Sequence, residues 1–203
     1  MTQAQIVTIP SLPTPLRWHD VPVNWSLDSN NKLSISAGKQ TDWFLDPAGS
    51  VNILNAPALF TQVQQPCMLK ARVTSNASAT FDAGVLAVYQ ADDQWAKLCF
   101  ELSPQKQLTI VSVVTKGTSD DCNSVPIIGQ SVYLRLSVLE KAFAFHYSLD
   151  DKTWNLVRYF TLGERQNLEI GFLSQSPTGE GCTSIFNQIA FVPQKLSDLR
   201  SGV

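Results

Sequence analysis

The segment WAKLCFE, residues 95–101, places an aromatic ring, a cation, a thiol and a carboxylate at alternate positions: Trp95, Lys97, Cys99 and Glu101. The residues between them are apolar. Successive residues of a β-strand point to opposite faces of a sheet, so these four side chains should share one face. Lysine donates hydrogen bonds, a carboxylate accepts them, and tryptophan can stack on an apolar ring face. The segment therefore predicts a strand with one face in the core and one polar face suited to a ligand.

Polar side chains at alternate positions also mark other strand-like segments. Arg72, Arg135 and His146 each stand opposite apolar neighbours, and Gln175 takes a similar place in a later segment. We predict that these residues join the 95–101 set on one concave face that binds a polar ligand. The alternative is that the charged members form ordinary cross-strand ion pairs, each contributing roughly 0.2–1 kcal/mol.

Two further segments add candidates for the same face. QTDWFLDP, at 40–47, holds an aromatic residue that could edge a cleft, and TKGTSDDCNS, at 115–124, is predicted to be a polar loop that holds hydroxyls beside adjacent acids. The candidates taken from them are Trp43, Thr115, Ser119 and Asp120. Adjacent acids can bind calcium, but the spaced acids of a dedicated calcium loop are lacking, and these residue types also cap turns. The two histidines lack metal-type spacing, so we predict neither a metal nor a cofactor, with calcium at 119–124 as the alternative.

Ten strand-like segments must position these residues. They are rich in β-branched and aromatic residues, and polar, Gly or Pro turns separate them. The segments are 33–37, 67–75, 83–90, 95–102, 108–115, 132–139, 142–149, 154–162, 168–176 and 184–192. Short turns between many of them predict antiparallel hairpins, and no long amphipathic helical window is found. The pattern predicts an all-β chain, residues 1–203, folded as a single antiparallel β-sandwich with two sheets of about five to seven strands.

The same alternation predicts the core and the course of the chain ends. Eight apolar residues should lie between the sheets: Leu98, Phe100, Leu134, Leu136, Phe143, Phe145, Ile170 and Phe172. The Pro-rich segment 1–22 should run as extended chain over the sandwich, and residues 193–203 should form a C-terminal tail.

The composition argues against several classes of partner. The 203 residues carry a net charge of −2 and contain no basic run, which argues against binding nucleic acid or an anionic membrane. The N-terminal stretch lacks the regions of a signal peptide, and no apolar run approaches the roughly 18 residues of a membrane span. The four cysteines contain no C-x-x-C pair. We expect free thiols and a cytoplasmic location, although the sequence leaves open whether Cys122 and Cys182 pair.

Seven motifs, in order along most of the chain, resemble the DUF1349 family, whose fungal members are called regulation of enolase protein 1. They are TDWFLDP, NAPALF, FDAGVLAVYQADDQWAKLCFE, IVSVVTKGTSDDCNS, VYLRL, FHYSLDDKTWNLVR and GFLSQSPTGEGC. The resemblance implies a concanavalin A-like β-sandwich of jelly-roll type and no established enzymatic activity. The family's W-x-K-x-x-x-E strand falls on Trp95, Lys97 and Glu101, and its L-R strand falls on Arg135. Asp151 stands where the family's S-x-D-G-x-x-W turn usually has glycine.

Three functions follow as hypotheses. The leading one is a non-catalytic cytosolic protein that binds a carbohydrate or related polar metabolite on its concave face. The first alternative, motivated by the fungal family name, is a regulator that contacts a metabolic enzyme such as enolase, a glycolytic partner. The second alternative is a glycoside hydrolase that uses Glu101.

Hydrolysis is the less favoured of these hypotheses. It usually needs two carboxylates, about 5–5.5 Å apart in retaining enzymes and about 6.5–9.5 Å apart in inverting ones. Only Glu101 stands on its strand, so a second acid would have to come from Asp82, Asp120 or Glu169. Lys97, four residues away on the same face, should lower the pKa of Glu101 and so oppose a role as general acid. The sequence therefore predicts binding without hydrolysis.

Overall fold

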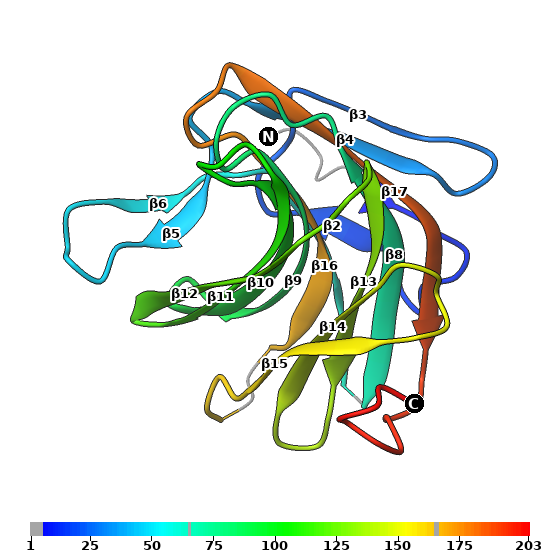
Figure 1. The fold of residues 1–203 in the computed structure, drawn as a ribbon. Helices are drawn as coiled ribbons and strands as arrows, with labels where there is room; N and C mark the ends of the chain where they lie inside the picture. Colours follow the sequence, from blue (N-terminus) through cyan, green and yellow to red (C-terminus); the bar gives the residue numbers. More distant parts are fainter. Residues whose placement is uncertain (1–5, 65, 165–166) are drawn as a thin grey trace.

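Two β-sheets face each other across a shared core, and a short hairpin stands outside them (Figure 1). The computed structural model describes residues 6–64, 66–164 and 167–203, and no helix occurs in these ranges. Every strand pairing within them is antiparallel. The predicted all-β antiparallel sandwich is thereby confirmed. None of the described segments forms a helix with the length and apolar character needed to cross a membrane.

The strands of the two sheets interleave along the sequence, as in a jelly roll. The eight-stranded sheet runs, in spatial order, β1 (Ile6–Val7), β2 (Leu16–Trp18), β7 (Ala58–Gln62), β16 (Glu169–Gln175), β9 (Ala83–Ala91), β10 (Gln94–Leu102), β11 (Leu108–Lys116) and β12 (Thr118–Pro126). The seven-stranded sheet runs β15 (Asn155–Phe160), β14 (Phe143–Ser148), β13 (Ser131–Val138), β8 (Cys67–Ser75), β17 (Gly181–Val192), β4 (Leu33–Gly38) and β3 (Asn24–Leu27). The hairpin consists of β5 (Trp43–Leu45) and β6 (Asn52–Leu54).

Alternating burial along the strands builds the core between the sheets. In β8, for example, every second residue from Cys67 to Ser75 is buried, and the residues between them are partly or fully exposed. All eight residues predicted for the core are buried in this cluster: Leu98, Phe100, Leu134, Leu136, Phe143, Phe145, Ile170 and Phe172. Burial of large apolar side chains at every second position is what holds each strand in its register.

Three expectations about the edges of the fold need correction. The polar segment 115–124, read as a loop, is mostly edge strand β12, which Gly117 (φ 76°) joins to β11. An edge strand can be polar because solvent satisfies its free side, so the apolar pattern of a strand is missing. That strand brings one sheet to eight members, more than the five to seven predicted.

The N-terminal segment does not only pass over the sandwich, because β2 pairs with β7 and extends the sheet. Residues 1–5 of that segment lie outside the described residues.

The core should be sensitive to loss of volume. Replacing Leu98, which is fully buried, by alanine should lower the free energy of unfolding by about 2–5 kcal/mol, because a cavity remains. Leu149→Ala, the same change at an exposed position, is the control and should alter stability by less than about 0.5 kcal/mol. Urea unfolding measures both variants. Equal effects of the two changes would contradict the assignment of Leu98 to the core.

Candidate functional site

The concave face is the side of the eight-stranded sheet that points away from the seven-stranded sheet. β9 to β12 curve around it, and the β5–β6 hairpin lies on that side (Figure 1). Residues directly opposite in antiparallel strands share a face, so the strand register decides which side chains lie there. Lys97 lies opposite Ala87 of β9, and Glu101 lies opposite Ala83. These small neighbours leave space over the sheet for the two long polar side chains.

Lys97 is the centre of a buried polar network on the concave face. It is only 2% exposed, and its Nζ lies 3.0 Å from Asp42 Oδ1 and 2.9 Å from Gln175 Oε1. Burial works to lower the pKa of Lys97, but the Asp42 carboxylate and neighbouring groups outweigh it, so the pKa lies above 10.5. The lysine is therefore charged at neutral pH and is held by partners from two other parts of the chain, Asp42 and Gln175.

Glu101 stands beside this network without a partner of its own. Its side chain is 7% exposed, and no group in the described residues donates a hydrogen bond to its carboxyl or forms an ion pair with it. Burial raises the pKa of Glu101 to about 8, while Lys97 lowers it and the acids Asp121 and Asp42 raise it further. At neutral pH the carboxyl is mostly protonated, so it can donate one hydrogen bond and accept others.

The expected effect of Lys97 on Glu101 is therefore wrong in its net direction. The lysine does lower the pKa of Glu101, as predicted, but the cost of desolvating the charged carboxylate is larger. The lysine charge is also shared with Asp42, which lies in direct contact with it. The spacing in the sequence showed that the two groups are near each other and could not show how deeply they are buried.

The loop candidate Asp120 faces away from the concave face. It pairs in register with Val114, a core residue, and its Oδ2 lies 2.7 Å from Arg158 Nη2. Its neighbour Asp121 is the acid on the concave face, because it lies opposite Val113, which in turn lies opposite Lys97. Burial raises the pKa of Asp121 from 3.8, and Lys97 opposes this. Asp121 could not be identified from the sequence because this polar segment reads as a loop, in which alternation assigns no face.

Five rings form an aromatic cluster at the other end of the concave face: His19, Trp43, Phe60, Tyr89 and Trp95. Trp43 is central, with ring centroids 5.6 Å from Trp95 and Phe60 and 5.7 Å from Tyr89. The Trp95 indole donates to the Asp92 carbonyl oxygen at 3.1 Å. Trp43 is 1% exposed and Trp95 is 0% exposed, so neither presents a ring face to a ligand. The predicted stacking role of these two tryptophans is therefore wrong, and their rings instead form an apolar floor.

Thr115 and Ser119 lie on the concave face, and their hydroxyls are already engaged. The two oxygens are 2.8 Å apart, and the Ser119 hydroxyl accepts a hydrogen bond from the Leu45 backbone N–H at 3.0 Å. Leu45 belongs to β5, so this contact fastens the β5–β6 hairpin to the β11–β12 hairpin. Both residues are buried, and their observed contacts hold the wall of the site.

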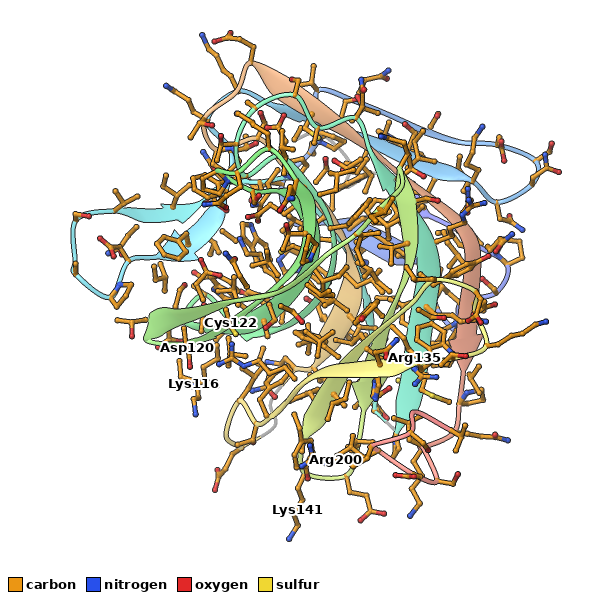
Figure 2. All side chains as sticks on the ribbon, in the orientation of Figure 1. Lys116, Asp120, Cys122, Arg135, Lys141 and Arg200 are labelled. Atoms are coloured by element: carbon orange, nitrogen blue, oxygen red, sulfur yellow. The ribbon has the colours of Figure 1, made fainter. Side chains whose placement is uncertain are left out.

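Arg72, Arg135 and His146 do not join the concave face. They belong to β8, β13 and β14 of the seven-stranded sheet and lie on its outer side. Figure 2 shows Arg135 on that sheet, well apart from Asp120 on β12. The prediction of one common face is wrong for these three residues, because alternation separates core from surface but does not identify the sheet. Seven predicted residues do share the concave face: Trp43, Trp95, Lys97, Glu101, Thr115, Ser119 and Gln175.

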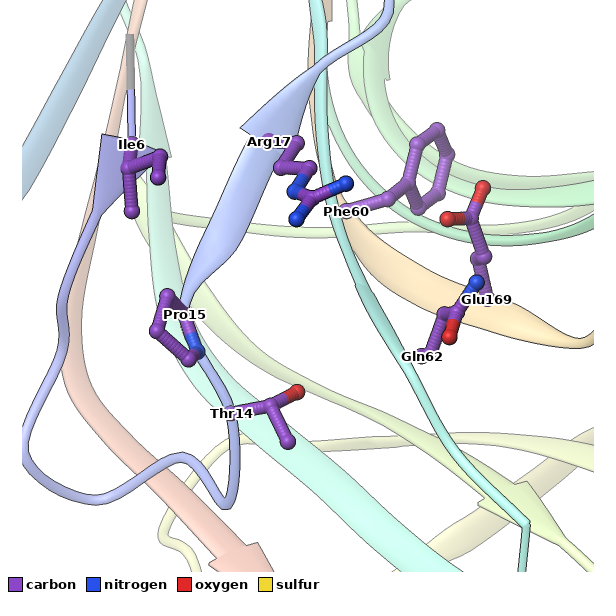
Figure 3. Close-up of a pocket in the computed structure, with 7 residues that line it drawn as sticks. All are labelled: Ile6, Thr14, Pro15, Arg17, Phe60, Gln62 and Glu169. Atoms are coloured by element: carbon purple, nitrogen blue, oxygen red, sulfur yellow. The ribbon is translucent and has the colours of Figure 1, made fainter. Parts of the chain in front are cut away.

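A pocket of about 230 Å³ opens beside the aromatic cluster, where β2 and β7 form the edge of the face (Figure 3). Arg17, Phe60 and Glu169 line it, together with three residues of the N-terminal segment and Gln62. Glu169 Oε2 lies 2.7 Å from His19 Nε2. The sequence alone does not predict this pocket, because part of its wall comes from the Pro-rich segment, which lacks the alternating pattern of a strand.

The four cysteines differ in exposure, and none of them forms a disulfide. The cysteines are free, so Cys122, which is exposed, does not pair with Cys182, which is buried. Burial raises the pKa of Cys99 well above 9, which keeps this thiol of the concave face protonated. Within the described ranges no group of three or more His, Cys, Asp or Glu residues is placed to hold a metal ion.

Comparison with known proteins identifies the fold. Residues 18–194 match the family described as "Protein of unknown function (DUF1349)". No curated protein matches the chain. A functionally unknown protein from Saccharomyces cerevisiae is similar in structure, with a TM-score of 0.81 and 21% identity over 87% of this chain and 95% of that one.

Two bacterial structures share the fold at lower identity. A GH43 protein from Bacillus licheniformis has a TM-score of 0.70 and 14% identity, covering 88% of this chain but only 37% of that one. The carbohydrate binding module CBM66 from Bacillus subtilis has a TM-score of 0.56 and 11% identity, covering 86% of this chain and 94% of that one. Likenesses of this kind show a concanavalin A-like β-sandwich fold.

Glu101→Gln should change how stability depends on pH. The folded pKa of about 8 lies above the ordinary 4.5, so the contribution of Glu101 is full below pH 4.5 and is lost as the pH rises to about 8. Relative to Glu101→Gln, the wild type should lose up to roughly 4 kcal/mol of unfolding free energy between about pH 5 and about pH 9. Urea unfolding at both pH values measures this, with exposed Glu180→Gln as the matched control. Parallel pH profiles of wild type and Glu101→Gln would contradict the raised pKa.

Proposed function

This chain belongs to the DUF1349 family of proteins of unknown function, and we propose that it binds a carbohydrate or a related polar metabolite on its concave face without catalysis. The observation that carries the proposal is the carboxyl of Glu101. It is almost fully buried, has no partner in the described residues and lies on the same face as the charged Lys97. The carboxyl is not bonded within the protein, so it is available to a polar ligand that reaches the concave face.

The charges and donors of the face suit a neutral, hydroxyl-rich ligand. An ammonium has three N–H donors, and Asp42 and Gln175 take two from Lys97, leaving one for a hydroxyl oxygen. The protonated Glu101 both donates and accepts, and Asp121 is a further acceptor. An anion would meet the carboxylates of Asp42 and Asp121, and a cation would meet Lys97. A polyol avoids both repulsions.

The comparisons support the ligand class by analogy only. One similar structure is named a carbohydrate binding module, and others are GH43 proteins of which this chain spans about a third. A shared fold does not transfer a function, so the proposal depends on the residues of the face. We also propose a cytoplasmic location, since four free cysteines suit a reducing compartment. Contact with a glycolytic enzyme such as enolase stays a hypothesis from the fungal family name.

Glycoside hydrolysis is the second candidate, and the raised pKa of Glu101 favours it because a general acid needs one. Two other carboxyl groups lie on the face, those of Asp42 and Asp121, and both raise the pKa of Glu101. Asp42 is engaged by the Lys97 ammonium at 3.0 Å. Asp82 lies away from the face, bound by the Ser176 hydroxyl at 2.7 Å. Glu169 lies opposite Tyr89, which in turn lies opposite Trp95. Trp95 is six residues from Glu101, or about 20 Å along β10.

The remaining acids do not complete a catalytic pair. Asp120 faces Arg158, away from the concave face. Asp121 lies on β12 at the level of Lys97. The backbone of Lys97 is four residues, or about 13 Å, from that of Glu101 along β10. Retaining and inverting enzymes need carboxyls within about 5–10 Å of each other. The geometry therefore supports binding over hydrolysis.

A glycan array and a thermal-shift screen with sugars and sugar phosphates should identify a ligand. Glu101→Leu and Lys97→Met should each weaken its binding by about 10–100-fold, because hydrogen bonds to these groups are lost. Arg72→Gln, on the outer side of the other sheet, is the matched control and should keep the wild-type affinity. A screen without any hit, or equal loss in the Arg72 variant, would contradict binding at the concave face.

Aryl glycosides and β-glucans should not be hydrolysed above background, because Asp42 is engaged by Lys97 and Asp121 lies on another strand, four residues along the sheet from Glu101. Release of the aryl group, followed over hours at about pH 5 and pH 7, measures this. The opposite result is equally clear. Turnover that disappears in Glu101→Gln, with sugar binding retained, would make the protein a glycosidase.

A further inference from the structure

Three basic side chains stand in one row on the outer side of the seven-stranded sheet. Arg135 of β13 lies directly opposite Lys70 of β8 and His146 of β14. Arg135 is 7% exposed and His146 is 0% exposed, so the middle of the row is shielded from water. Burial lowers the pKa of His146 to about 4, so this histidine is neutral at neutral pH and the charges of the row are those of Lys70 and Arg135. Like charges opposite each other on neighbouring strands repel, and buried charges need compensation. The row therefore favours a negative group beside it.

The acids near this row do not neutralise Arg135. Asp151 Oδ1 lies 2.7 Å from Lys70 Nζ and so compensates the lysine. Asp150 accepts backbone hydrogen bonds from Thr153 at 2.8 Å and Lys152 at 2.9 Å, which lower its pKa to about 2 and hold it in the turn. In the described part of the chain no carboxylate lies within ion-pair distance of the Arg135 guanidinium.

The guanidinium of Arg135 is only half satisfied on the edge that recognises oxyanions. Its Nη2 donates to the Gly202 carbonyl oxygen at 2.7 Å, while its Nε is buried and has no hydrogen-bond partner among the described residues. The Nε–H and Nη2–H bonds of arginine point in the same direction and together match two oxygens of one carboxylate or phosphate group. A backbone carbonyl can supply only one of those oxygens.

The C-terminal tail covers this edge of Arg135 with backbone carbonyl groups. The Gly202 carbonyl accepts from Arg135, and the Leu199 carbonyl oxygen accepts from His146 Nε2 at 2.9 Å. A hydrogen bond of 2.9 Å from Gly202 N to the Asp198 carbonyl oxygen closes the tail into a turn. The Trp154 ring stacks on the guanidinium of Arg135, with its ring centre 4.1 Å from Arg135 Cζ, and fixes the plane of the guanidinium.

We propose that Arg135, flanked by Lys70 and Trp154, is a binding site for a small oxyanion, a carboxylate or a phosphate group, and that tail residues 196–203 cover it. The Gly202 carbonyl stands where one oxygen of that group would lie. The ligand displaces the tail and satisfies both N–H bonds of the guanidinium edge. This site lies on the sheet opposite the concave face, so it is independent of the function proposed there.

Gly202 offers a way to open the tail without replacing Arg135. Its φ is 74°, and an added Cβ would lie 2.6 Å from Trp154 Cβ and 2.7 Å from Arg135 Nη2. Gly202→Ala should therefore release the tail. Gly117→Ala is the matched control, because Gly117 has a φ of 76° and nothing within 4 Å of an added Cβ. If Gly202→Ala fails to fold, Leu196→Asp removes a buried anchor of the same tail.

The readout is the NMR signal of the Arg135 Nε–H group, titrated in the full chain with acetate in one arm and inorganic phosphate in the other. We expect a saturable shift in Gly202→Ala, with at least about tenfold tighter binding than in wild type or Gly117→Ala, because closing the tail reduces the apparent affinity. The arm that binds more tightly identifies the source of the oxyanion.

Two results would overturn the proposal. The first is a folded, tail-released variant in which neither anion gives a saturable shift of Arg135. The second is an equal shift of the Nε–H signal of Arg72, which is exposed and contacts Ser131, since this would show unspecific association with cations. Equal binding by wild type and Gly202→Ala would remove the covering role of the tail.

Discussion

The buried Lys97 ammonium is the constraint on which the concave face depends. A charge with so little exposure needs compensation, and it finds it in Asp42, before β5, and Gln175, at the end of β16. These contacts join three segments that are far apart in the sequence. Because Trp43 follows Asp42 directly, the ion pair also places the β5–β6 hairpin and the indole that fills the centre of the aromatic cluster. One ion pair thus orders both the polar and the apolar half of the face.

The two outer faces of the sandwich have opposite chemistry. On the concave face, Glu101 and Asp121 surround one lysine, and burial raises the pKa of both acids. On the outer side of the other sheet, Lys70, Arg135 and His146 stand in a row with one acid bound to the lysine. A neutral polyol suits the first arrangement and an oxyanion suits the second. The core between the sheets keeps these two environments apart.

Local alternation predicted what depends on neighbours in the sequence, such as the core and the polar side of β10. It could not place Arg135 and Lys97 relative to each other, because both stand opposite apolar residues and only long-range pairing assigns them to different sheets. Asp121 was missed because an edge strand lacks an apolar pattern. The pKa of Glu101 was misjudged because proximity to a lysine can be read from spacing, whereas desolvation depends on how the folded chain packs around the carboxyl.

The claim that an uncharged carboxyl faces the ligand beside a buried lysine can be tested without knowing the ligand. The direct measurement is a titration of the Glu101 side-chain carboxyl by carbon-13 NMR in the full chain, assigned by comparison with Glu101→Gln. The structure predicts a midpoint at about 8. A midpoint at or below the ordinary 4.5 would show that Lys97 holds Glu101 ionised, and would contradict the proposed neutral carboxyl at the centre of the concave face.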